Sequence, residues 1–190
     1  MISLIASALI ATNAPAAEVV ANCRSMIPSD VELKGRIVLR TRRGIVKAEY
    51  DYDLARKGGE TDLRIAKDGQ DVEFEKTGPI LGTDVTWSDI TLDYLWWDDF
   101  AYDEKREGES VHGQVCTVIV MKKGDRTVRV WVDRKTGALM QAEEEKDGKS
   151  VRKLWGTRLK KFGERWMANV MEVETVGSGH RTKITVEELK

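Results

Sequence analysis

Residues 82–97 read Gly-Thr-Asp-Val-Thr-Trp-Ser-Asp-Ile-Thr-Leu-Asp-Tyr-Leu-Trp-Trp and form the one helical interruption in a run of predicted hairpins. Thr86 can cap a helix, because Asp89 follows three residues later in the spacing of a capping box. Apolar residues then recur at helical intervals, which predicts a short amphipathic helix over a sheet. The predicted lid helix contains Thr86, Trp87, Ile90 and Tyr94, with Trp97 on the same face.

Alternating apolar and charged residues occupy most of the remaining chain. In residues 46–54, for example, Val, Ala, Tyr, Tyr and Leu alternate with Lys, Glu, Asp and Asp, the pattern of a strand with one dry face. Turn signals such as Asp68-Gly69 and Asp147-Gly148 separate successive runs. The sequence therefore predicts a mainly β protein of about ten or eleven short antiparallel strands, in a strongly curved sheet or partly closed barrel.

The charge balance limits the kinds of partner. The 190 residues include 31 Lys and Arg and 32 Asp and Glu, giving a net charge of −1 with both signs interleaved. A nucleic-acid groove is therefore not expected. The chain length predicts a single domain, residues 18–190, and we expect it to be a monomer.

Residues 1–17 resemble a secretory signal peptide. An apolar stretch over residues 2–10 precedes small residues around Ala14, and the first charge is Glu18. The absence of Lys and Arg from the start departs from that pattern. A retained anchor and an ordinary N-terminal helix are the alternatives to a cleaved signal. We expect cleavage near Ala17 and export to the periplasm.

No pattern of catalytic or metal-ligating residues is found in the sequence. His112 and His180 each adjoin a glycine at a predicted turn, without the spacing of a metal site. No phosphate-binding glycine loop or nucleophile motif is present. We expect neither an enzyme nor a cofactor, and a periplasmic hydrolase is the least favoured function.

Six tryptophans and six methionines could line a pocket for a flexible apolar ligand, although core packing is the simpler interpretation. The alternation of residues along the later strands selects those expected to face inward. The predicted inward-facing, lipid-binding residues are Val128, Val130, Val132, Met167, Met171 and Ile184, together with Trp97. Residues 115–121 are apolar almost throughout, which predicts a strand covered on both faces.

An ordered set of short motifs is similar to the outer-membrane lipoprotein-sorting protein family, the LolA/LolB-like carriers. It begins with Gly82-Thr83-Asp84, Thr86-Trp87 and Asp89-Ile90, and continues through Gly113, Cys116 and residues 130–133. The resemblance implies a half-open β-barrel with short helices over its concave face. It also implies a carrier for acylated lipoproteins or similar amphiphiles, with membrane-bound donor and acceptor proteins as partners. The same fold serves in ligand-sensing modules of envelope-stress regulation, which is the alternative function.

The only two cysteines are Cys23 and Cys116. In an oxidising compartment an isolated pair most simply forms one disulfide, whereas in the cytosol both would be buried thiols. Some members of the lipoprotein-sorting family resemble this chain in carrying one cysteine in the N-terminal helix and another at the position of Cys116, which supports the disulfide. We therefore expect a Cys23–Cys116 bond tying the N-terminal helix to the apolar strand.

Overall fold

The computed structural model describes residues 15–162 and 165–190. Most of the predicted signal peptide, residues 1–14, lies outside the described residues, while Ala16 and Ala17 open the first helix. Within the described residues, no helix is long and apolar enough to cross a membrane.

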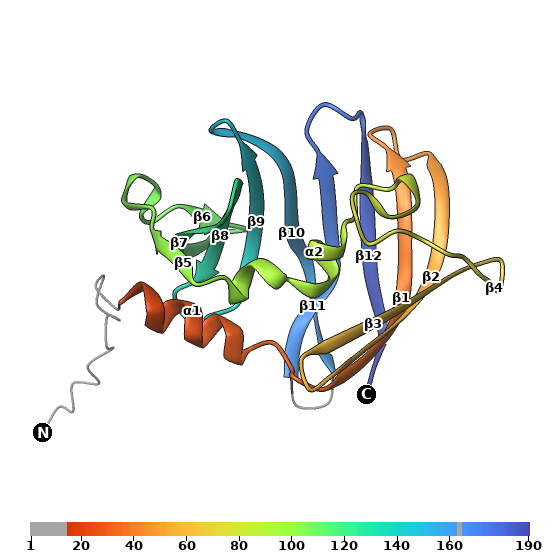
Figure 1. Ribbon diagram of the computed structural model, residues 1–190, viewed down its shortest axis with the longest axis horizontal. Helices are drawn as coiled ribbons and strands as arrows, with labels where there is room; N and C mark the ends of the chain where they lie inside the picture. Colours follow the sequence, from red (N-terminus) through yellow and green to blue (C-terminus); the bar gives the residue numbers. More distant parts are fainter. Residues whose placement is uncertain (1–14, 163–164) are drawn as a thin grey trace, which may run out of the picture.

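A single antiparallel sheet dominates the described part of the chain (Figure 1). Its twelve strands are β1 (Val31–Thr41), β2 (Val46–Lys57), β3 (Glu60–Lys67), β4 (Gln70–Asp71), β5 (Asp99–Tyr102), β6 (Ser110–Val111), β7 (Gln114–Lys123), β8 (Arg126–Asp133), β9 (Leu139–Lys146), β10 (Lys149–Phe162), β11 (Arg165–Thr175) and β12 (His180–Leu189). The strand order is β4-β3-β2-β1-β12-β11-β10-β9-β8-β7-β5, with β6 paired to β7. The sheet is curved and unclosed, so the predicted half-open β architecture is confirmed.

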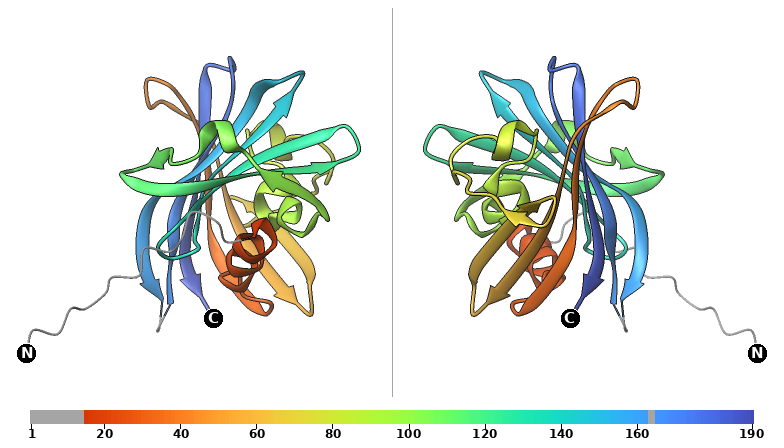
Figure 2. Two further views of the ribbon diagram at one scale, coloured as in Figure 1. Left: turned by 90° about the vertical axis from the view of Figure 1, so that its left-hand side faces the viewer. Right: turned by 90° about the vertical axis from the view of Figure 1, so that its right-hand side faces the viewer.

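Short helices lie within the curve of the sheet (Figures 1 and 2). They are α1 (Ala16–Ser25), η1 (Ile80–Gly82), α2 (Trp87–Thr91) and η2 (Asp93–Trp96), while η3 (Glu104–Arg106) follows β5. Residues 80–97, which contain η1, α2 and η2, are called the cover segment below. The cover segment lies between β4 and β5 in the sequence and interrupts the run of hairpins. The two halves of the sheet are joined instead by the pairing of β12 with β1.

The predicted lid helix is real but shorter than expected. Thr86 and Asp89 form the predicted capping box. Leu92 then adopts a left-handed conformation with φ of 54°, which ends α2 and starts η2 in a new direction. The expectation that Ile90, Tyr94 and Trp97 share one face of one helix is therefore wrong.

Two apolar clusters cover the inner face of the sheet. The row Val130, Ala142, Leu154 and Val173 runs across β8, β9, β10 and β11 as directly paired residues, so all four side chains share this face. The α1 cluster lies beneath α1 and η2 and includes Val20, Cys23, Tyr94, Leu95, Trp97, Ile119, Met121, Val128, Val130, Val132 and Ala142. The α2 cluster lies beneath η1 and α2 and includes Ile37, Tyr52, Leu54, Leu63, Ile65, Ile80, Val85, Leu154, Val173 and Ile184.

The opposite, outer face carries a smaller apolar cluster. It contains Val111, Cys116, Val118 and Trp131, with Met140 packed against them. Because Cys116 and Val118 alternate with Ile119 and Met121 of the α1 cluster, β7 is covered on both faces, as predicted.

The alternation of side chains along β7 also corrects the predicted disulfide. Cys23 and Cys116 are both buried free thiols. Cys23 packs on the inner face in the α1 cluster, whereas Cys116 packs on the outer face. The sheet therefore separates the two sulfur atoms, and the structure does not contain the predicted bond.

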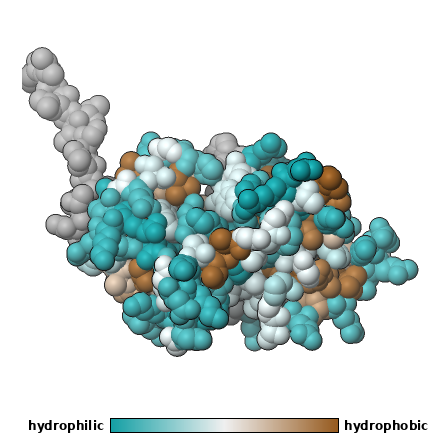
Figure 3. All heavy atoms as spheres, turned by 90° about the horizontal axis from the view of Figure 1, so that it is seen from above, coloured by the Kyte–Doolittle hydropathy of each residue, from teal (hydrophilic) through white to brown (hydrophobic). Residues whose placement is uncertain are grey.

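A few apolar side chains are exposed at the turns at one end of the sheet. Ile45 and Val46 lie at the β1–β2 turn and Val176 at the β11–β12 turn. Figure 3 views the molecule from this side, where hydrophobic patches stand within a largely hydrophilic surface. Scattered exposure of this kind is ordinary for a folded protein.

Candidate functional site: a tryptophan-lined cavity

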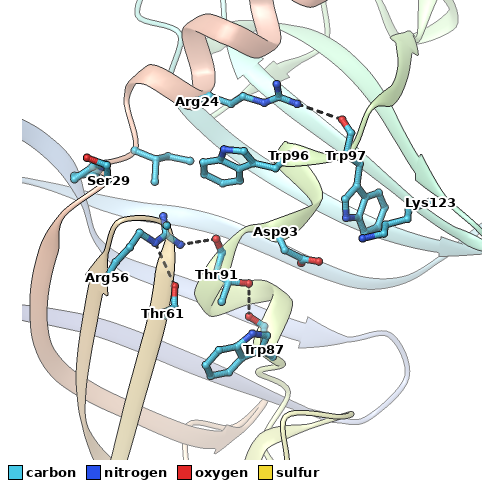
Figure 4. A pocket seen from close by; sticks show the side chains of 13 residues that line it. Arg24, Ser29, Arg56, Thr61, Trp87, Thr91, Asp93, Trp96, Trp97 and Lys123 are labelled. Atoms are coloured by element: carbon cyan, nitrogen blue, oxygen red, sulfur yellow. Dashed lines mark hydrogen bonds between the residues drawn. The ribbon is translucent and has the colours of Figure 1, made fainter.

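A cavity of about 660 Å³ opens between the end of α1, the β2–β3 hairpin and the cover segment (Figure 4). Its volume lies within the range typical of small-ligand sites. Ile27 and Trp97 in its wall pack in the α1 cluster, whereas Trp87 packs in the α2 cluster. The cavity thus lies at the seam between the two inner-face clusters. Its lining is Arg24, Ile27, Pro28, Ser29, Arg56, Gly59, Thr61, Trp87, Thr91, Asp93, Trp96, Trp97 and Lys123.

Two arginines in the wall fasten the cover segment to the rest of the molecule. Arg24 Nε donates to the Leu95 carbonyl at 2.6 Å, and its Nη2 donates to the Trp97 carbonyl at 3.2 Å. Arg56 Nη2 donates to the Thr91 carbonyl at 2.6 Å. The Leu95 carbonyl lies within η2 and the other two lie on either side of it, where the break at Leu92 prevents a continuous helix from satisfying them. One arginine comes from α1 and the other from β2, so the cover is held from both sides.

Aromatic and charged groups meet in the cavity. Figure 4 shows the Trp96 side chain between Arg24 and Arg56. The Arg56 guanidinium lies 5.7 Å from the centre of the Trp96 ring, within the range of a cation–π contact. Trp96 is 46% exposed, which is unusual for so large an apolar side chain. Burial lowers the pKa of the Arg56 guanidinium, since desolvation penalises its charged form.

Asp84, in the motif that carries the family resemblance, anchors the cover segment to β11 and β12. Its fully buried carboxylate accepts the Thr175 amide through Oδ1 at 3.0 Å. Oδ2 accepts the Thr182 hydroxyl at 3.0 Å and lies 3.0 Å from His180 Nδ1. His180 is therefore half-buried against a carboxylate rather than the simple surface-turn residue expected from sequence, whereas His112 is exposed in its turn.

Asp89 supplies the second anchor. Its Oδ2 accepts the Thr86 amide at 2.7 Å and the Thr86 hydroxyl at 2.9 Å, closing the capping box. The same oxygen pairs with Arg152 of β10, whose Nη1 also reaches Glu144 of β9 at 3.0 Å. Arg152 Nη2 additionally donates to the Asp84 carbonyl at 2.9 Å. Through Asp84 and Asp89, the motif thus connects the cover segment to the sheet by hydrogen bonds and ion pairs.

Most of the predicted lipid-binding residues lie in the packed core instead of the cavity. Val128, Val130 and Val132 belong to the α1 cluster, so their predicted inward orientation is confirmed. Ile184 and Met171 pack in the α2 cluster, while Met167 is half-buried on β11 outside both clusters. Of the predicted site and lid residues, the cavity is lined only by Trp87 and Trp97.

Sequence reasoning missed Arg24, Arg56, Trp96 and Lys123 as lining residues. They come from α1, β2, η2 and β7, so no local spacing connects them. The one available signal was the tryptophan pair at residues 96 and 97. Within the described ranges, no group of three or more His, Cys, Asp or Glu side chains could hold a metal ion.

Comparison with known proteins identifies the family. A family model described as "Uncharacterized protein" matches residues 71–190. The chain belongs to this family. No curated protein matches the sequence.

Solved structures with the same fold are similar over nearly their whole length. A LolA superfamily protein from Nitrosomonas europaea has a TM-score of 0.71 at 15% identity, covering 94% of each chain. A DUF1329 family protein from Desulfovibrio piger has a TM-score of 0.66 at 17% identity, covering 94% of this chain and 93% of the other. A domain described as outer membrane lipoprotein-sorting, from Vibrio parahaemolyticus, has a TM-score of 0.65 at 13% identity, with coverages of 91% and 90%. The LolA-like fold implied by the sequence motifs is therefore confirmed.

Proposed function

We propose that this protein is a periplasmic carrier that binds the acyl chains of lipoproteins or similar amphiphiles. The observation that carries the proposal is the position of the cavity. It is walled by three tryptophans at the seam between the two apolar clusters of the inner face. The described relatives, a LolA superfamily protein and a lipoprotein-sorting domain, share the fold and support the proposal.

A carrier must shield its cargo from water and later release it. Burial of an acyl chain is worth about 0.8 kcal/mol per CH₂ group, so a chain of ordinary length needs a large apolar surface. In this proposal the chain enters at the seam and displaces the cover segment, exposing the inner-face residues Val130 and Ile184 to the ligand. The role needs no catalytic step or cofactor, and membrane-bound proteins would deliver and receive the cargo.

The hydrogen bonds from Arg24 and Arg56 to backbone carbonyls suit a reversible cover. Each hydrogen bond from a charged donor contributes a net stabilisation of about 1.5–3 kcal/mol to the closed cover. Burial of several CH₂ groups of the ligand can offset the loss of such a bond. The buried Asp84 and Asp89 contacts hold the start of the cover segment more firmly. We therefore expect the η2 end to move and the α2 start to stay in place.

Intrinsic tryptophan fluorescence tests the proposal. A synthetic acylated peptide should cause a saturable change, whereas the same peptide without the acyl chain should not. Trp96→Ala removes an exposed lining residue and should weaken binding of the acylated peptide about threefold or more.

Trp155→Ala is the matched control for Trp96→Ala. Trp155 directly follows the inward-facing Leu154 on β10, so alternation places it on the outer face, where its ring contacts Arg181. Loss of this tryptophan should leave the affinity unchanged. If acylated and unacylated peptides behave alike, and protein from the native host carries no co-purifying lipid, the carrier proposal fails.

A further inference from the structure

We propose that the cavity binds the anionic head group of an acylated amphiphile, with Arg24, Arg56 and Lys123 around a phosphate or carboxylate. The tryptophans of the wall would contact the adjoining part of the chain. This inference rests on the proposed carrier function and specifies the class of ligand.

The charge of the cavity differs from that of the whole protein. Three cationic side chains and one carboxylate, Asp93, line it, which gives a local net charge of +2, whereas the chain as a whole has −1. A concave site with one dominant sign of charge concentrates ligands of the opposite sign. The cavity therefore favours an anion over a neutral or cationic head group.

The cations retain hydrogen-bond donors that the protein does not use. Arg24 and Arg56 each bond through Nε and Nη2, which leaves Nη1 of both without a partner among the described residues. Lys123 likewise forms no ion pair within the described part of the chain. A guanidinium presents its donors in a planar fork that matches phosphate and carboxylate oxygens.

Two buried polar atoms beside the cavity also have no partner. Trp97 is 4% exposed, and its indole Nε1 donor is buried without an acceptor. Oδ1 of Asp93 is buried without a donor. An unmatched buried donor or acceptor costs about 1–3 kcal/mol, so a ligand that supplies partners gains that energy. An anionic oxygen would suit Trp97, and a hydroxyl of the head group would suit Asp93.

The tryptophans that line the cavity indicate that its ligand also has an apolar part. The rings of Trp87, Trp96 and Trp97 provide large, rigid contact surfaces next to the charged groups. Arg56 already contacts the Trp96 ring, and burial lowers the pKa of its guanidinium. An anion bound there would restore the favourable environment of that charge. The cavity thus combines an anion site with an apolar wall, which is the chemistry of an amphiphile.

Binding of three defined probes tests the inference. Lysophosphatidylglycerol is a single-chain anionic amphiphile, lysophosphatidylcholine with the same chain is zwitterionic, and glycerol phosphate has no chain. At low salt, the anionic amphiphile should bind roughly tenfold more tightly than the zwitterionic one, and the difference should shrink as salt is raised. Glycerol phosphate alone should bind far more weakly than either amphiphile.

Two variants of opposite expected effect separate an anion site from general packing. Lys123→Gln should weaken lysophosphatidylglycerol binding about threefold and weaken lysophosphatidylcholine binding by less, because the choline cation of the latter offsets the charge of its phosphate. Asp93→Asn removes the one carboxylate and should strengthen binding of the anionic probe by a similar factor. Lys122→Gln is the matched control: Lys122 adjoins Lys123 on β7, points to the opposite face and should have no effect.

The head-group inference would be overturned, and the carrier function left intact, if the two amphiphiles bound with equal affinity. It would also be overturned if Lys123→Gln and Asp93→Asn did not change the affinity for the anionic probe in opposite directions. Glycerol phosphate binding as tightly as the anionic amphiphile would also overturn it, because the site would then recognise a free anion. If neither amphiphile binds, both the inference and the carrier function are refuted.

Discussion

The motif at residues 82–90 stabilises the fold mainly through two buried carboxylates, those of Asp84 and Asp89. The capping role of Asp89 was predictable, because Thr86 lies only three residues away. The role of Asp84 was not, since its partners Thr175, His180 and Thr182 lie more than 90 residues along the chain. Local spacing cannot reveal such contacts, so the motif was recognisable from sequence while its physical purpose was not.

Removal of the Asp84 carboxylate should destabilise the fold strongly. Asp84→Ala leaves the Thr175 amide and the Thr182 hydroxyl without an acceptor in a buried site. We expect the free energy of unfolding in urea to fall by about 2–4 kcal/mol. Asp98→Ala, at an exposed carboxylate, should change it by less than about 0.5 kcal/mol. A comparable loss in both variants would argue against the anchoring role of Asp84.

The two thiols should behave as buried, unpaired groups. Burial raises the pKa of the Cys23 thiol to about 11, opposed only partly by Arg24, so little thiolate forms at pH 8. The native protein should therefore react slowly with a thiol reagent at pH 8, and urea should release two reactive thiols per chain. The original disulfide hypothesis would be restored if non-reducing mass spectrometry of the unfolded protein found no thiol.

At the scale of elements, alternation along the strands predicts which side chains face inward, whereas the length of the α2 helix depends on a feature that local sequence does not reveal. The inward orientation of Val128, Val130 and Val132 followed from a period of two, and the structure confirms it. The end of α2 at Leu92 depends on a left-handed backbone conformation at a residue that is not glycine, for which the sequence carries no signal. The direction of η2, and with it the position of the cavity, therefore could not be predicted.

Arg56 should control the mobility of the η2 end of the cover segment. Arg56→Gln removes the charged donor to the Thr91 carbonyl, and we expect amide hydrogen exchange in residues 91–97 to accelerate roughly tenfold. Arg64→Gln alters an exposed arginine of the neighbouring strand β3, paired with Asp71, and should leave this exchange unchanged. Equal exchange in the wild-type protein and Arg56→Gln would show that this hydrogen bond does not hold the cover.

At the scale of the whole molecule, the curved meander was predictable because turn signals and alternation recur along the chain. The lining of the cavity was not, since it brings together α1, the β2–β3 hairpin, the cover segment and the end of β7. The predicted ligand residues were instead those of the packed inner face, including Val130 and Ile184. In the proposed carrier, these residues become accessible only when the cover segment moves.

Photo-crosslinking with an acyl chain that carries a diazirine at its terminal carbon tests the central claim most directly. If the chain enters at the seam and displaces the cover, mass spectrometry should locate cross-links from the terminal carbon on inner-face residues such as Val130 and Ile184. An unlabelled acylated peptide should compete for them. Cross-links confined to the outer face around Trp155, or unaffected by the competitor, would contradict the account.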